Sequence, residues 1–220
     1  MTGGTPEDRH EILPKLHADH LDALQEIGNI GAGHSATALS QLLNRRVDMS
    51  VPRAAICSIE EFSTKILSDP EEPLVAVISE TSGDVAMHLV GLFDLASINR
   101  LMWIIRKQKV EDNLMEISTI DRSFICEIGS ILLLHYVSAI TEFTDLLMFP
   151  QVPSIAIDMG KAILDSILLL NAVDYNTVLS IEVDIFTDNV QLNSTMVMLP
   201  DRHTLNRILS QLFSEGWAQE

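Results

Sequence analysis

The chain is poor in basic residues and in cysteines, and each shortage excludes a class of protein. Lys and Arg number 14 against 31 Asp and Glu, which gives a formal net charge of −17 at pH 7. A protein this acidic lacks the basic surface that binds nucleic acid or an anionic membrane. The two cysteines, Cys57 and Cys126, belong to no CxxC pair. They predict no disulfide framework.

The sequence also lacks a secretory leader and a long uninterrupted apolar run. Its N-terminus has no basic segment followed by an apolar one. The most apolar stretch, residues 131–140, contains His135 and Ser138 and is too short to span a bilayer. Hydrophobic residues make up 47% of the 220, enough for a sizeable aliphatic core. We predict a soluble cytoplasmic protein in which residues 1–14 form a flexible N-terminal tail.

What the sequence does contain is a polar stripe on a helix predicted from about residue 17 to residue 44. At about 100° per residue, Asp22, Glu26 and Asn29 fall on one narrow face, and Gly33 continues it. A solvated helix surface would give the same pattern, so the stripe alone does not establish a site. The opposite face is apolar or small: Leu24, Ile27, Gly31, Ala38 and Leu42.

The pattern returns 101 residues later on a second helix predicted at about residues 120–143. In each half, 22 residues separate the last stripe position from a proline in a Val-Pro pair. We therefore predict an internal duplication, with repeat one at about residues 16–109 and repeat two at about residues 114–214. The equivalent positions are Asp22 and Ser123, Glu26 and Glu127, Asn29 and Ser130, and Pro52 and Pro153.

Each repeat is predicted to run helix, strand, short element, hairpin, helix. The first strand, residues 47–58, contains Pro52, which favours a sheet edge or a bulge. A short helix is predicted at residues 59–66, and turn residues indicate hairpins around residues 82–84 and 187–189. The predicted fold class is α/β: one pseudo-two-fold domain over residues 15–220, with long helices packed on a sheet rich in antiparallel strands.

The spacing Asp/Ser-x3-Glu-x2-Asn-x22-Pro resembles the signature of the CheC/CheX/FliY phosphatases, which dephosphorylate the chemotaxis response regulator CheY. The resemblance spans roughly residues 16–213 and looks most like CheC. In the second half Ser130 departs from the asparagine of the signature. The first half supplies every position of the signature: Asp22, Glu26, Asn29 and Pro52.

The resemblance implies hydrolysis of an aspartyl phosphate, a reaction that depends on positioning and charge stabilisation. The Asn29 amide carries a donor and an acceptor and can hold the attacking water. Glu26 would pair with the active-site lysine of the regulator, which also supplies Mg²⁺, so no cofactor of its own is expected. Pro52 would shape the backbone beneath the helix, and Asp22 would support Glu26 or touch the partner.

The second half predicts a degenerate site made of Ser123, Glu127, Ser130 and Pro153. Beside it, Leu134 and Val137 replace the small residues of the first stripe. One explanation is structural: the buried face of the helix could shift around its axis toward the C-terminal end and cover both side chains. The alternative is an exposed partner-binding patch, with CheD, a second copy of the chain or a static regulator contact as the candidates.

Two other functions stay open at this point. The first is a non-catalytic adaptor of the chemotaxis system that docks the regulator or binds CheD. A flagellar switch component like FliY is the second, but it would need a further C-terminal domain. His17 and His20 could begin a metal site, yet no second cluster completes it, so no metal is predicted. The glycines at positions 28, 31 and 33 lie within a helical pattern, which excludes a dinucleotide fingerprint.

Overall fold

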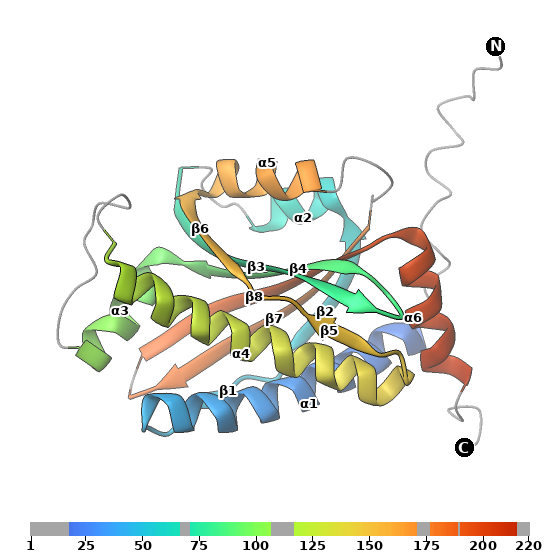
Figure 1. Ribbon diagram of the computed structural model, residues 1–220, viewed down its shortest axis with the longest axis horizontal. Coiled ribbons are helices and arrows are strands. Elements are labelled where there is room, and N and C mark those ends of the chain that lie inside the picture. The colour runs from blue at the N-terminus through green and yellow to red at the C-terminus, as the bar shows by residue number, and fades with distance from the viewer. Residues whose placement is uncertain (1–17, 67–70, 107–116, 171–176, 189, 215–220) are drawn as a thin grey trace, which may run out of the picture.

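The computed structural model describes residues 18–66, 71–106, 117–170, 177–188 and 190–214. Helices cover both faces of a curled antiparallel sheet (Figure 1). The two long helices, α1 and α4, lie side by side on one face, α2 and α5 lie on the other, and α3 and α6 lie at the two ends. The predicted tail at residues 1–14 lies outside the described residues. The helices are α1 (Ala18–Leu43), α2 (Ile59–Ile66), α3 (Leu95–Arg106), α4 (Thr119–Thr144), α5 (Gly160–Leu170) and α6 (Arg202–Ser214).

The described residues form a sheet of eight strands in which every neighbouring pair is antiparallel. The strand order is β1-β7-β8-β4-β3-β5, with β2 also on β7 and β6 also on β3. This confirms the predicted class of long helices on an antiparallel sheet. The strands are β1 (Asp48–Met49), β2 (Arg53–Ser58), β3 (Pro73–Gly83), β4 (Met87–Asp94), β5 (Met148–Pro150), β6 (Ser154–Met159), β7 (Thr177–Thr187) and β8 (Val190–Pro200).

The two halves of the chain pair their strands in the same way. Ala54 of β2 pairs with Ile181 of β7. Its equivalent 101 residues later, Ile155 of β6, pairs with Val77 of β3. Six residue pairs make each of these ladders. The matching registers are what the predicted duplication would produce, and descent from one duplicated unit stays a prediction.

The first predicted strand is interrupted by a bulge. Met49 pairs with Ile185 and Arg53 pairs with Glu182, so three residues on one side oppose two on the other. Pro52 lies in this gap, where its missing N–H costs no ladder hydrogen bond. The prediction of an edge or a bulge is confirmed, and the prediction of one continuous strand is wrong.

Apolar side chains fill the space on both sides of the sheet. The larger cluster lies beneath α1 and α4 and includes Leu24, Ile27 and Ile128. A smaller cluster contains Phe62 of α2 and Ile163 of α5. Burial of each such side chain is worth about 1.5–3 kcal/mol. Packing of Leu24 and Ile27 against the sheet therefore turns the opposite, polar face of α1 outward.

Helix α4 is long and apolar enough, by length and composition, to cross a membrane. Half of its most apolar window, 50%, is buried inside the protein. A buried core helix passes the same test of length and composition, so α4 is weak evidence for a membrane span. The helix extends well beyond residues 131–140, the stretch predicted to be too short to span a bilayer.

Candidate functional site

The polar stripe of α1 lies on the outer surface. One direct contact links two members of the stripe, because the Asn29 Nδ2 donates a hydrogen bond to the Glu26 Oε2 at 3.3 Å. Among the described contacts, none joins Asp22 to Glu26. The stripe therefore presents an acid and an amide side by side to any partner that docks on α1. All four predicted positions are exposed: Asp22, Glu26, Asn29 and Gly33.

Two glycines bring α1 close to its neighbours. A Cβ placed on Gly28 would lie 3.1 Å from the Cβ of Pro52, and one on Gly31 would lie 2.8 Å from the Cδ1 of Tyr136. Gly33 differs, because a Cβ there would meet nothing within 4 Å. Gly28 and Gly31 thus serve close packing, as predicted for Gly31, whereas Gly33 leaves the stripe flat and open. Pro52 is buried beneath the helix, which agrees with its predicted structural role.

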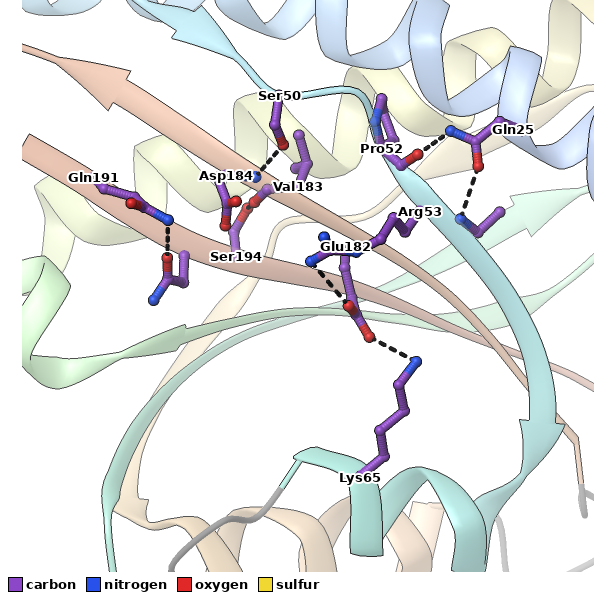
Figure 2. Close-up of polar contacts among 12 residues, drawn as sticks. Gln25, Ser50, Pro52, Arg53, Lys65, Glu182, Val183, Asp184, Gln191 and Ser194 are labelled. Carbon is purple, nitrogen blue, oxygen red and sulfur yellow. Dashed lines mark hydrogen bonds and ion pairs between the residues drawn. The ribbon is translucent and has the colours of Figure 1, made fainter.

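Gln25 contacts the bulge and was not singled out from the sequence. Its side-chain amide donates a hydrogen bond to the carbonyl oxygen of Pro52 and accepts one from the backbone N–H of Ala54 at 3.1 Å (Figure 2). Position 25 lies on the flank of the stripe, about 60° from Asp22. Only the proximity of α1 to a segment 27 residues later gives this side chain its partners.

The two motif helices meet at a pair of histidines. The rings of His34 on α1 and His135 on α4 are edge to face, with centroids 5.9 Å apart. Burial, with a smaller contribution from His34, lowers the pKa of His135. His34 lies on the side of α1 that faces α4, outside the acid and amide stripe. Its side chain is exposed.

The second stripe turns its hydroxyls toward its own helix. The Ser130 Oγ donates a hydrogen bond to the Cys126 carbonyl at 2.6 Å, and the Ser123 Oγ donates to the Thr119 carbonyl at 2.9 Å. A serine hydroxyl has one hydrogen-bond donor, and in both residues it is used within the helix and is not directed at a partner or a water. Glu127 remains exposed between them. The second stripe therefore offers a carboxylate without an amide beside it.

Of the two predicted partner-binding residues, the structure leaves one at the surface. Leu134 is 48% exposed, but Val137 is 2% exposed and belongs to the larger core cluster. The prediction for Val137 is wrong because at about 100° per residue it lies roughly 80° from Glu127, on the flank of α4 that packs inward. Leu134 lies within about 20° of Glu127 and stays outside with it.

Metal binding finds no support in the described part of the chain. No group of three or more His, Cys, Asp or Glu side chains there is arranged to hold an ion. His17 and the side chain of His20 lie outside the described residues. Both cysteines are free thiols in this part of the chain, and burial raises the pKa of each.

Comparison with known proteins places these features in a family. The family described as CheC-like matches residues 20–56, the segment that contains the α1 stripe and the Pro52 bulge. The CheY-P phosphatase CheC of Bacillus subtilis (strain 168) is 30% identical over 207 residues, which cover 91% of this chain and 97% of that protein. The flagellar motor switch phosphatase FliY of the same organism is 44% identical over 104 residues, 45% of this chain but 26% of FliY.

A solved structure supports the fold independently. The X-ray structure of Thermotoga maritima FliY superposes with a TM-score of 0.69 at 17% identity, covering 90% of this chain and 98% of that one. At this level of identity, the superposition establishes the arrangement of helices and sheet and nothing further. The Bacillus CheC match extends over nearly the whole of both chains, and on that basis this protein belongs to the CheC-like family.

Proposed function

We propose that the protein is a phosphatase that hydrolyses the aspartyl phosphate of a CheY-type response regulator, with a single active site formed by Glu26 and Asn29. The observation that carries the proposal is the exposed acid and amide pair on the outer face of α1, joined by a 3.3 Å hydrogen bond. The similarity to the CheY-P phosphatase CheC of Bacillus subtilis supports the choice of substrate.

Asn29 has the chemistry to position the attacking water. A carboxamide can accept a hydrogen bond from water through its oxygen and donate one through its nitrogen. The bond from Asn29 to Glu26 is longer than the usual 2.7–3.2 Å for N–H···O, so turning the amide toward a water costs little. Attack of that water on phosphorus breaks the bond to the aspartyl oxygen and releases inorganic phosphate and the free carboxylate.

Glu26 is suited to holding the regulator in register. A carboxylate cannot approach the phosphoryl oxygens, because like charges repel. It can pair with the lysine beside the phosphate, and this draws the neighbouring Asn29 toward the phosphorus. The regulator would supply the Mg²⁺ of the reaction. Positioning of this kind can provide a large part of the rate enhancement.

We further propose that the second stripe is not catalytic and that the reaction takes place in the cytoplasm. Ser130 bonds to its own helix, and no amide lies beside Glu127. Two helices that lie side by side on one face of the sheet, α1 and α4, would thus carry one intact and one degenerate copy of the same motif. An adaptor role alone would not call for an amide next to the acid on α1.

The test is the decay of a phosphorylated CheY-type regulator in the presence of Mg²⁺, followed as phosphate release. Asn29→Ala should slow the accelerated reaction by about 10²-fold, the effect typical of losing one positioned polar group at a reacting centre. The matched control is Ser130→Ala, which truncates the side chain to alanine at the equivalent position of the second stripe. This variant should hydrolyse the phosphate at a rate within about twofold of wild type. Equal activity of wild type and Asn29→Ala would exclude the assigned site.

A further inference from the structure

The bulge after β1 leaves two backbone groups on the free side of the sheet edge. The carbonyl of Pro52 and the N–H of Ala54 are two residues apart, so they point to the same side of the strand. Gln25 of α1 satisfies both groups, donating to the first and accepting from the second at 3.1 Å (Figure 2). A carboxamide carries the donor and acceptor of a peptide group. Gln25 therefore takes the place of a neighbouring strand and ties α1 to the sheet edge.

This attachment lies directly beneath the proposed site. Gln25 immediately precedes Glu26, and Gly28, which packs on Pro52, immediately precedes Asn29. Each candidate catalytic residue thus follows a residue that fixes the helix to the bulge. Around the other side of α1, the approach of Gly31 to the ring of Tyr136 limits rotation of the helix.

The second half of the chain has a weaker attachment at the equivalent place. Cys126 occupies the position of Gln25, and its Sγ donates one long hydrogen bond, 3.8 Å, to the carbonyl oxygen of Pro153. A thiol is a weak donor, and it is too short to span two backbone groups. The full acid and amide motif and the two-point amide contact occur in the same half, and both are missing from the other.

From these contacts we infer that Gln25 is a positioning residue for the proposed reaction: it holds the α1 turn that carries Glu26 and Asn29 at a fixed height above the Pro52 bulge. The inference rests on the proposed function and adds a residue outside the four-position signature. Gln25 faces the protein and is half-buried, so it acts through its neighbours and not on the phosphate.

The size of the effect follows from the contacts that remain. Displacement of a reacting group by about 1 Å can cost about 10²-fold in rate. The packing of Gly28 on Pro52 survives removal of the Gln25 amide and limits the shift, so we expect kcat to fall about tenfold. KM should stay within about twofold, because the exposed stripe that meets the regulator keeps its residues.

The experiment compares the full-length protein with Gln25→Met, which keeps length and apolar bulk but removes the amide. Gln25→Glu is the second variant, since it keeps the acceptor for Ala54 and loses only the donor to Pro52. Cys126→Met is the matched control at the equivalent position. For each protein, kcat and KM are measured with a phosphorylated CheY-type regulator, together with the melting temperature and hydrogen exchange at the Ala54 amide.

We expect faster exchange at Ala54 in Gln25→Met, a lower kcat with KM nearly unchanged in both Gln25 variants, and wild-type kinetics in Cys126→Met. If wild type is active and both Gln25 variants keep its kcat, the positioning role is wrong while the proposed function stands. A Gln25→Met protein that fails to fold leaves the decision to Gln25→Glu. If wild type does not accelerate phosphate release, the proposed function and this inference both fail.

Discussion

The packed face and the open face of α1 can be compared by making the same substitution at one position on each. Gly31 and Gly33 are two residues apart in the same helix, so Gly→Ala gains about 1 kcal/mol of helix propensity at each. At Gly33 a Cβ meets nothing within 4 Å, so the gain should appear in full. At Gly31 the Cβ would lie 2.8 Å from the Cδ1 of Tyr136, and that ring is 1% exposed and has little room to move.

Overpacking of this kind costs about 1–3 kcal/mol. Gly33→Ala should therefore be more stable than wild type by about 1 kcal/mol, and Gly31→Ala should be less stable than Gly33→Ala by about 1–3 kcal/mol. For a chain of this size each kcal/mol corresponds to roughly 2–4 °C in melting temperature. The difference is measured by thermal and urea unfolding of both variants in parallel with wild type.

A Gly31→Ala protein as stable as Gly33→Ala would refute the reasoning, because it would mean that α1 and α4 do not approach at Gly31 as closely as described. A different slope of the urea transition in only one variant would indicate a change in the compactness of its denatured or native state, or a departure from two-state unfolding. The rate of phosphate release by Gly33→Ala is measured separately. A reduced rate in this folded variant would indicate that the regulator needs the flat surface at position 33.

Three further predictions follow from the charges and exposures of the two motif helices. Glu26→Lys should reduce phosphate release more than Glu26→Gln, because like charges at a desolvated contact cost several kcal/mol; equal rates would show that this acid only decorates the surface. Glu127→Ala should leave the rate of phosphate release nearly intact, and a large loss of rate would contradict the one-site proposal. Leu134→Asp should weaken association with a partner, measured by sedimentation or titration, without lowering the melting temperature. Burial lowers the pKa of His135 from its ordinary 6.5, so the unfolded chain binds more protons and stability should fall as the pH drops through and below that value. The variant His135→Gln should remove part of that loss in unfolding experiments between pH 7.5 and 5.5, and an unchanged pH dependence would contradict this prediction.

Periodicity in the sequence determined the long helices and the exposed face of α1, and turn residues indicated the hairpins. The predicted helix at residues 17–44 agrees with Ala18–Leu43, and the short helix predicted at residues 59–66 agrees with Ile59–Ile66. The spacing of Glu26 and Asn29 placed both side chains on one surface, where they are found. These features follow from the chain because a repeat of about 3.6 residues is a local property of the backbone.

Contacts between distant segments were decided only by the tertiary structure. The bulge at Pro52 depends on how β1 and β2 register against β7, a strand more than 120 residues later. The role of Gln25 depends on the distance between α1 and that bulge, which lets its side chain reach the backbone of Pro52 and Ala54. Val137 is buried because α4 turns one flank toward the core. Periodicity defines the angle of a side chain around its helix, but the helix's neighbours determine which angles are covered and which polar groups find a partner.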